Sequence, residues 1–268
     1  FSYFMKQLLL LLLFIPLVSF GQEQETIENK FSIPDGYERV YNDDYSKFLR
    51  QFPLKKDNTV QRSDGTYKTN SEIWIAVFDY DLGVHKTHQC ADAVIYLNAM
   101  HKYEQGMAGQ IKYHFTNGDT AKYQDWLDGI NYKLDENNSR ILNKEWTSPR
   151  TDNLKTFKEW IKVVWIWAGT KSLHFDTMSV NMGDIMPGDV FNYNGHAVSV
   201  VDVVVNKDSG HKKYILAQSW MRDRRTGEEH HVLINPKSKD VWYDLNTNET
   251  IVTPQWLFEP NHLIRFKN

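Results

Sequence analysis

The second half of the chain contains three β-rich segments joined by two short turns, and this feature constrains the fold most. The segments are Gly188–Phe191, His196–Val205 and Lys213–Trp220. The turns at 192–195 and 206–210 contain asparagine and glycine, which tight turns favour. Strands joined by such short turns pair antiparallel, so the sequence predicts an antiparallel meander.

The first half of the chain has helical periodicity instead. Apolar residues recur at helical spacing from Cys90 to about Tyr103 and over 151–168. We expect strands at 73–78, 111–115, 232–234, 241–243 and 263–266, and short helices at 45–51 and 123–130. Helices followed by a strand meander predict an α+β fold, with a helix packed against one face of an antiparallel sheet.

The N-terminal residues have the pattern of a secretory signal. A lysine precedes an apolar run over 8–18, and small residues follow at 19 and 21. We expect residues 1–21 to be the signal, the residues upstream of Met5 to have no structural role, and the location to be secreted or periplasmic. The apolar run is shorter than the about 20 residues of a spanning helix, so we expect no stable membrane anchor.

Composition limits the remaining residues to a globular protein. A hydrophobic content of 41% excludes wholesale disorder, and a net charge of −3 without a basic block argues against nucleic acid as a partner. We expect residues 22–60 to form an extension that packs on the core, with Gln22–Lys30 flexible. Residues 61–268 should form one domain, for which the sequence predicts no particular oligomeric state.

Cys90 is the chain's single cysteine. Exported proteins use cysteine mostly in disulfide pairs, so a lone thiol is either a small buried residue or a reactive group. Cys90 falls in the first turn of its predicted helix, where the helix dipole favours the thiolate. Asp92 lies in the same turn, and its negative charge opposes the thiolate.

A nucleophilic thiol needs a base, and the base needs a third group that orients it. His196 opens a strand directly after a glycine turn, at the rim of the predicted sheet, and is the candidate base. Strand alternation puts Asp202 on the same face as His196. Six residues along a strand span roughly 20 Å, however, so Asp202 is too distant to be the third group.

Gln218 is the candidate for the third group. If Val205 pairs with His211 across the second turn, His196 lies opposite Trp220, and Gln218 is its diagonal neighbour on the same face. A register shift of one residue would place Gln218 on the wrong face.

Four segments carry a resemblance to a known superfamily: Cys-Ala-Asp at 90–92, Pro-Gly-Asp-Val at 187–190, Gly-His-Ala-Val at 195–198, and Gln218 on the return strand. In this order they resemble the papain-like fold and are most similar to the NlpC-type and CHAP-type cell-wall amidases and peptidases. The exported part also resembles a secreted bacterial domain family without an established activity.

The resemblance implies a papain-like α+β fold in which the Cys-bearing helix packs against the antiparallel sheet. It also implies an exported cysteine-dependent hydrolase of amide or peptide bonds, with Cys90 as nucleophile, His196 as base and Gln218 as orienting residue. Peptides of the peptidoglycan type would be the leading substrate class, and no cofactor would be needed.

Three further residues are candidates for the cleft. Gln89 could complete an oxyanion hole with the Cys90 N–H, His88 could shape the electrostatics around the thiol, and Trp220 could line the cleft. His85, His88 and His101 lack the spacing of a zinc motif, so we expect no metal site.

Two alternatives stay open at this point. The first is a non-catalytic binding module of the same fold that recognises glycan or peptide. The second is an acyltransferase, because an amine and water can attack the same acyl intermediate.

Overall fold

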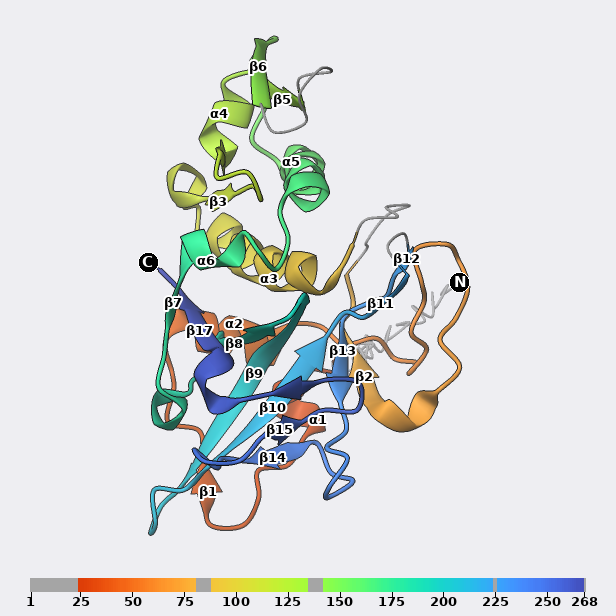
Figure 1. Ribbon diagram of the computed structural model, residues 1–268, viewed down its shortest axis with the longest axis vertical. Helices are drawn as coiled ribbons and strands as arrows, with labels where there is room; N and C mark the ends of the chain where they lie inside the picture. Colours follow the sequence, from red (N-terminus) through yellow and green to blue (C-terminus); the bar gives the residue numbers. More distant parts are fainter. Residues whose placement is uncertain (1–23, 81–87, 135–141, 224–225, 268) are drawn as a thin grey trace, which may run out of the picture.

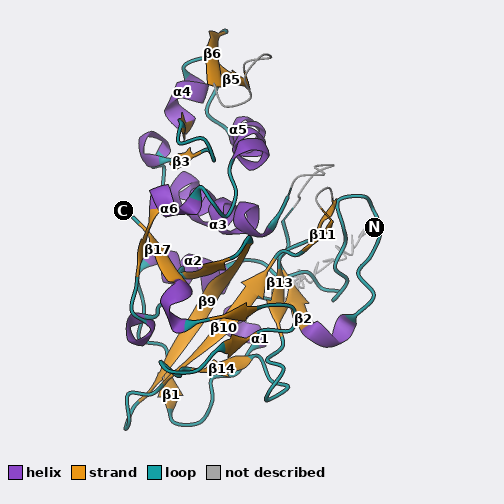
Figure 2. Cartoon of the chain, in the orientation of Figure 1, coloured by secondary structure: helices purple, strands orange, loops and turns teal. Residues whose placement is uncertain are grey.

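The computed structural model describes residues 24–80, 88–134, 142–223 and 226–267, and its centre is one antiparallel sheet (Figures 1 and 2). The strands of this sheet are β1 (Tyr37–Glu38), β2 (Trp74–Val77), β7 (Thr177–Ser179), β8 (Val190–Tyr193), β9 (His196–Asn206), β10 (Lys212–Gln218), β13 (His231–Leu233), β14 (Trp242–Asp244) and β17 (Leu263–Phe266). Their order is β2-β13-β10-β9-β8-β17-β7, with β1 also paired to β9 and β14 to β10. The predicted meander is β8, β9 and β10, which are neighbours in this sheet. The α+β class and the antiparallel sheet are confirmed.

The helices are α1 (Ile27–Lys30), α2 (Asp44–Gln51), α3 (Cys90–Glu104), α4 (Tyr123–Leu127), α5 (Leu154–Trp167) and α6 (Leu173–Asp176). Figure 1 shows α3 lying across one end of the sheet, with α4 and α5 beyond it. Helix α3 packs against β9, α2 and α5. Its residues from Cys90 to Ala99 are all buried, because neighbours cover it on several sides.

Several short strands and 3-10 turns lie outside the main sheet and the helices. Among the described residues, two-stranded sheets pair β3 (Lys112–His114) with β4 (Thr120–Lys122), β5 (Ile130–Leu134) with β6 (Leu142–Trp146), β11 (Met221–Asp223) with β12 (Thr226–Gly227), and β15 (Ile251–Val252) with β16 (Leu257–Phe258). Single 3-10 turns are η1 (Ser71–Ile73), η2 (Ala108–Gln110), η3 (Met182–Asp184) and η4 (Pro260–His262).

Strand β9 separates two buried clusters, one on each face of the sheet. The first cluster includes Ala197, Val201 and Val204 of β9 with apolar residues of α1, α2, α3 and α5. The second includes Val198, Val200 and Val203 of β9 with Phe191 and Phe258. Because both faces are covered, β9 is apolar along most of its length rather than alternating.

A β-bulge shifts the pairing of β9 with β10 halfway along the strands. Near the turn, Val205 pairs with Lys212 instead of the predicted His211. Farther along, Ala217 pairs with Ser199, which is the predicted register. The bulge absorbs the one-residue difference. The predicted register is therefore wrong at the turn and correct at the end that carries the candidate site.

The bulge also corrects the predicted position of Asp202. Val201 is unpaired at the bulge, because its two neighbours on β9 pair with consecutive residues of β10. This extra residue reverses the alternation, so Asp202 leaves the face that the sequence predicted it to share with His196. Its carboxylate accepts a hydrogen bond from Arg39 Nε at 2.8 Å and lies 3.9 Å from Arg50.

The N-terminal segment is folded onto the core. Gln22–Lys30 was expected to be flexible, but α1 forms within it and is capped by the Thr26 side chain, which accepts a hydrogen bond from the Asn29 N–H at 3.3 Å. Ile27 is fully buried in the first cluster, together with Leu49 of α2. The expected flexibility is therefore wrong for the described residues of this segment.

Several predictions concern residues outside the described ranges. These are the signal at 1–21, His85 and the loop at 135–140. Within the described ranges, no helix combines the length and apolar character that crossing a membrane requires.

Candidate active site

Cys90 is the first residue of α3, and its neighbours explain why the helix begins there. Gln89 has an extended backbone, with φ −119° and ψ −177°, and is the N-cap. The Asp92 carboxylate accepts a hydrogen bond from the Gln89 N–H at 2.7 Å, which is the acidic half of a capping box. Asp92, which opposes a thiolate, therefore also holds the start of the helix.

The Cys90 thiol is buried beneath the exposed turn that precedes β9. The residue is 4% exposed, and Sγ lies 3.8 Å from the carbonyl oxygen of Gly195. Burial raises the pKa of the thiol to about 11; the N–H of Ala197 acts in the opposite direction, and the charge of Asp92 adds to the rise. The thiol is therefore protonated at neutral pH.

The His196 imidazole is hydrogen-bonded to the predicted orienting residue. Its Nε2 lies 3.0 Å from Oε1 of Gln218. Burial lowers the pKa of His196 to about 4; the Gln218 hydrogen bond raises it, and the positive charge of Lys68 lowers it further. The imidazole is therefore neutral at pH 7.

Aromatic side chains surround the same imidazole. The ring centroid of His196 lies 4.8 Å from that of Trp220, 5.3 Å from Trp256 and 6.1 Å from Phe258. Trp220 and Trp256 are half-buried, so the indoles reach the surface while they cover the imidazole. Trp220 was the aromatic residue predicted for the cleft, and the structure places it against the candidate base.

The structure brings Cys90 and His196 to the same end of β9. The sulfur reaches the carbonyl of Gly195 and the N–H of Ala197, which are the peptide groups on the two sides of His196. In the part of the chain that the structure describes, no hydrogen bond or ion pair joins the sulfur to the imidazole. The two groups therefore adjoin the same backbone position without a hydrogen bond in this state.

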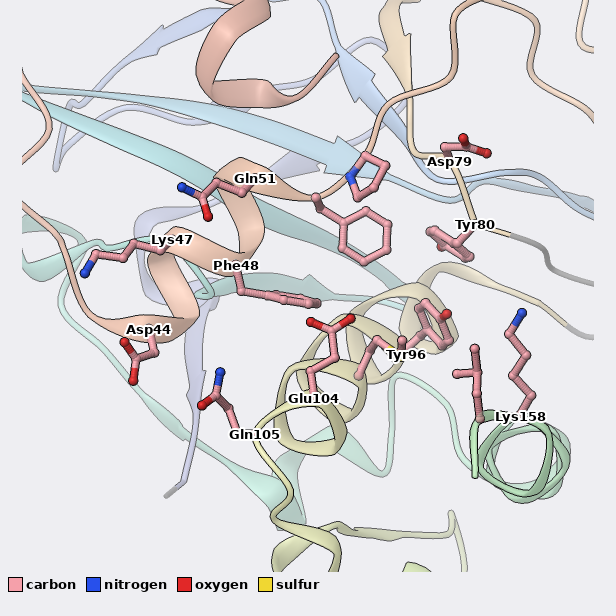
Figure 3. Close-up of a pocket in the computed structure, with 14 residues that line it drawn as sticks. Asp44, Lys47, Phe48, Gln51, Asp79, Tyr80, Tyr96, Glu104, Gln105 and Lys158 are labelled. Carbon is pink, nitrogen blue, oxygen red and sulfur yellow. The ribbon is translucent and has the colours of Figure 1, made fainter. Parts of the chain in front are cut away.

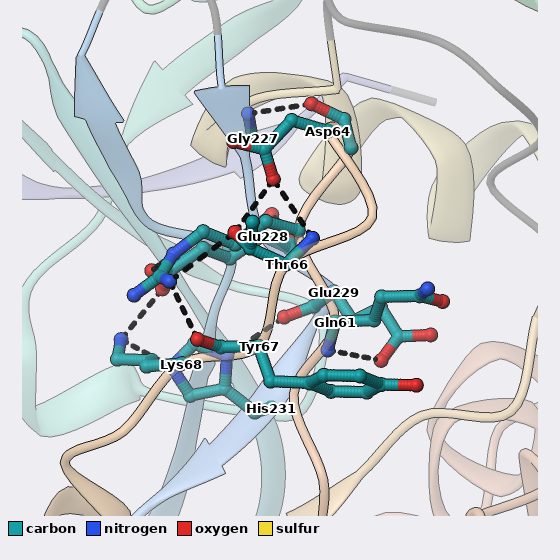
Figure 4. Close-up of polar contacts among 12 residues, drawn as sticks. Gln61, Asp64, Thr66, Tyr67, Lys68, Gly227, Glu228, Glu229 and His231 are labelled. Carbon is teal, nitrogen blue, oxygen red and sulfur yellow. Dashed lines mark hydrogen bonds and ion pairs between the residues drawn. The ribbon is translucent and has the colours of Figure 1, made fainter.

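A buried polar network behind Gln218 was not predicted from the sequence. Gln218 Nε2 donates to Gln255 Oε1 at 2.7 Å, and Lys68 Nζ donates to the same oxygen at 3.0 Å. Lys68 Nζ also lies 2.6 Å from Glu228 Oε2 and 3.5 Å from His231 Nε2 (Figure 4). These residues are far apart in the sequence and belong to no local motif, so only the fold brings them together.

His88 and Gln89 are held by contacts within the protein. His88 is fully buried, with Nδ1 3.2 Å from Ser219 Oγ and Nε2 3.2 Å from the Tyr80 hydroxyl. Burial lowers the pKa of His88 to about 3, so it adds no net charge beside the thiol. The Gln89 N–H is engaged by the capping box and is not free to bind an oxyanion.

The histidines considered for a metal site have other surroundings. The ring of His101 packs against Tyr45 and Phe48, with centroids 4.9 and 5.4 Å apart, whereas His88 contacts Tyr80 and Ser219. Among the residues with described positions, no group of three His, Cys, Asp or Glu side chains could hold a metal ion.

A cavity of about 630 Å³ lies among α2, α3 and α5 (Figure 3). Its aromatic lining is Phe48, Phe52, Tyr80 and Tyr96. Charged side chains stand at its edge, among them Glu104 of α3 and Lys158 of α5. None of the three candidate catalytic residues lines this cavity.

Comparison with known protein families adds a classification. Residues 27–265 match a family described as a domain of unknown function (4846). The chain belongs to this family. Searches of curated proteins and of solved structures each found no match. The family match covers nearly the whole described chain but specifies no function, so the functional argument rests on the geometry of the site.

Proposed function

We propose that this chain is an exported cysteine-dependent hydrolase of amide or peptide bonds. In the proposed reaction the Cys90 S–H proton passes to Nδ1 of His196 while Sγ bonds to the substrate carbonyl carbon. The leaving amine takes that proton as the C–N bond breaks, and a thioester remains on Cys90. His196 then removes a proton from water, the resulting hydroxide attacks the thioester, and the returned proton restores the thiol.

The position of the Cys90 sulfur carries this proposal. The sulfur lies against both peptide groups that flank His196, so nucleophile and base share one strand end. Gln218 holds the imidazole by Nε2, which leaves Nδ1 for the thiol proton. The segments 187–190 and 195–198 add the resemblance to cell-wall amidases, and for this reason peptidoglycan stem peptides are the proposed substrate class.

Burial makes the proposed resting state a neutral pair. With a thiol pKa of about 11 and an imidazole pKa of about 4, no thiolate–imidazolium pair exists before substrate binds. Proton transfer and attack on the carbonyl would therefore occur together, as in hydroxyl-based triads. The substrate would have to bring the thiol and Nδ1 into hydrogen-bond range.

The test measures turnover of soluble peptidoglycan fragments and a set of N-acyl amides by mass spectrometry of the products. Cys90→Ala should abolish turnover, and His196→Ala should lower it by about 10²- to 10⁴-fold. His101→Ala, a half-buried histidine on the opposite end of α3, is the matched control and should retain activity. Turnover that survives in Cys90→Ala would contradict the proposal.

A binding module is the second candidate, and the aromatic cavity favours it. A cavity of about 630 Å³ is within the size of small-ligand sites, and its aromatic walls suit a peptide side chain or a sugar face. In this case Tyr96→Ala should weaken binding of peptidoglycan fragments by at least about tenfold, as measured by calorimetry. Cys90→Ala should leave the affinity unchanged, which separates the two candidates.

A further inference from the structure

We infer that Lys68 is a positioning residue that sets the tautomer of His196 through the side-chain amides of Gln255 and Gln218. The inference about the tautomer concerns the resting protein, and only its catalytic consequence rests on the proposed hydrolase function. In the described part of the chain no hydrogen bond joins Lys68 to the imidazole, on which its charge acts through space. It acts through the series of hydrogen bonds that leads from Lys68 to His196, because each bond in this series can be donated in one direction only.

The Lys68 ammonium has three N–H donors and three acceptors around it. Nζ lies 2.6 Å from Glu228 Oε2, 3.0 Å from Gln255 Oε1 and 3.5 Å from His231 Nε2 (Figure 4). His231 Nδ1 lies 2.7 Å from the carbonyl oxygen of Glu229, which can only accept. His231 Nε2 therefore carries no proton and accepts from Lys68.

The direction of donation then passes along the two amides. An ammonium cannot accept, so the Gln255 atom that faces Lys68 must be the oxygen. That oxygen also faces Gln218 at 2.7 Å, so the Gln218 atom there must be the amide nitrogen. The Gln218 oxygen is therefore left for His196, at 3.0 Å from Nε2. Nε2 must carry the proton, and Nδ1 of the neutral ring is the free base.

The far end of the network keeps Lys68 charged and in place. Its side chain is 5% exposed, and the Glu228 carboxylate that it contacts is 2% exposed. Burial lowers the pKa of Lys68, and the contact with Glu228 raises it. Glu228 also accepts from Arg62 Nε at 3.1 Å, so the carboxylate is held from two sides. A buried, paired ammonium is a fixed donor, which a solvent-exposed lysine would not be.

Without the fixed donor Lys68, the orientation of both glutamine amides is no longer determined. If Lys68 is replaced by methionine, Gln255 and Gln218 can both rotate by half a turn without losing their mutual hydrogen bond. The Gln218 nitrogen would then face Nε2, and the proton of the neutral ring would move to Nδ1. In that tautomer Nδ1 has no lone pair for the thiol proton.

The experiment reads the tautomer directly by long-range ¹H–¹⁵N NMR on ¹⁵N-histidine-labelled, substrate-free protein at pH 7. The His196 signal is assigned by its absence in His196→Gln. The unmodified chain should show the Nε2–H form. Lys68→Met should raise the proportion of the Nδ1–H form, whereas Lys55→Met should not. Lys55 is a matched control because it also contacts an acid, Glu229, at 3.1 Å, but lies outside the chain of amides.

Gln255 supplies a second pair of variants, in case Lys68→Met does not fold. Gln255→Glu keeps an acceptor for both Lys68 and Gln218, so it should preserve the Nε2–H form. Gln255→Leu removes that acceptor, so the proportion of the Nδ1–H form of His196 should rise. A dominant Nδ1–H form in the unmodified protein would overturn the inference. An unchanged tautomer ratio in folded Gln255→Leu or folded Lys68→Met would also overturn it.

The kinetic measurement tests the catalytic consequence separately. With a substrate that the chain turns over, Lys68→Met should lower kcat by about tenfold and change KM less. A shifted tautomer in a chain without hydrolase activity would leave the inference intact and refute the proposed function. If the unmodified chain is active but Lys68→Met leaves the His196 tautomer unchanged, the proposed function would stand and the inference about Lys68 would be refuted.

Discussion

At the scale of single residues, burial sets the charge of both candidate catalytic groups. Cys90 is 4% exposed and His196 is 3% exposed. Transfer from water disfavours the charged form of each, which raises the pKa of the thiol to about 11 and lowers that of the imidazole to about 4. The helix dipole predicted a thiolate at this position, but its stabilisation is smaller than the cost of burying the charge.

The first prediction concerns alkylation of Cys90. Because the thiolate fraction rises about tenfold per pH unit below the pKa, the iodoacetamide rate should rise from pH 7 to 10 without a plateau. Asp92→Asn keeps an oxygen for the Gln89 N–H. Because burial raises the pKa of Asp92, this variant should react faster at pH values where the Asp92 carboxyl is ionised, and equally fast below them. A plateau near pH 8.5 or below, in protein that circular dichroism shows to be folded, would refute the raised pKa.

The second prediction concerns the pH dependence of turnover. A general base must be unprotonated, so kcat/KM should be constant from about pH 5 to 9 and should fall below the His196 pKa of about 4. Activity is thus present above this pKa and lost as the pH falls through it. The measurement is the pH profile of kcat/KM on the best amide substrate. An acid limb near the ordinary histidine value would show that His196 is not buried as described.

At the scale of elements, the residues before α3 are held by the small sheet of β11 and β12. A Cβ added to Gly227 of β12 would lie 1.5 Å from the carbonyl oxygen of His88, two residues before Cys90. Ser63 also donates its N–H to the Gly227 carbonyl at 2.9 Å, so β12 is held on a second side. The glycine therefore permits a close approach that fixes where the helix start lies.

The third prediction follows from this contact. Gly227→Ala should force the His88 backbone to move and lower the free energy of unfolding by about 1–3 kcal/mol. Gly169→Ala is the matched control, because an added Cβ there meets nothing within 4 Å, and it should be nearly neutral. Urea unfolding measures both. Equal stability of Gly227→Ala and the unmodified chain would show that this approach is not tight in solution.

The elements themselves were largely predictable, because local periodicity and turn residues specify them. The strand at 263–266 and the start of the helix at Cys90 agree with the sequence to the residue. The bulge at Val201 was not predictable, since one valine among six within β9 carries no local sign that it lacks a partner. A bulge depends on how two strands pair, which is a property of the sheet.

At the scale of the whole molecule, distant segments complete the candidate site. The sequence could predict Cys90, His196 and Gln218 as candidates, because each has a position within a recognisable element. It could not predict Lys68 or Gln255, since both lie in irregular segments whose path is fixed only by the assembled core. The same assembly buries several histidines, among them His88, His196, His230 and His231, each with a lowered pKa.

The fourth prediction concerns the loss of stability at low pH that a buried neutral histidine causes. His230 allows this effect to be measured apart from the effects of other titrating groups. Both ring nitrogens of His230 lack a hydrogen-bond partner in the described residues, and the ring packs against Phe78. Burial lowers the pKa of His230 from 6.5 to about 3. Its contribution to stability is therefore fully present above pH 6.5 and is lost as the pH falls, by about 2 kcal/mol at pH 5.

His230→Phe keeps the contact with Phe78 and removes the titrating group, so it should match or exceed the unmodified chain at pH 7.5. Its advantage in unfolding free energy should grow by about 2 kcal/mol at pH 5. The comparison between the two proteins is needed because buried carboxyls with raised pKa, such as Asp189, act with the opposite sign in both. Urea unfolding at the two pH values gives the difference, and a difference independent of pH would mean that His230 is protonated or solvated in the folded protein.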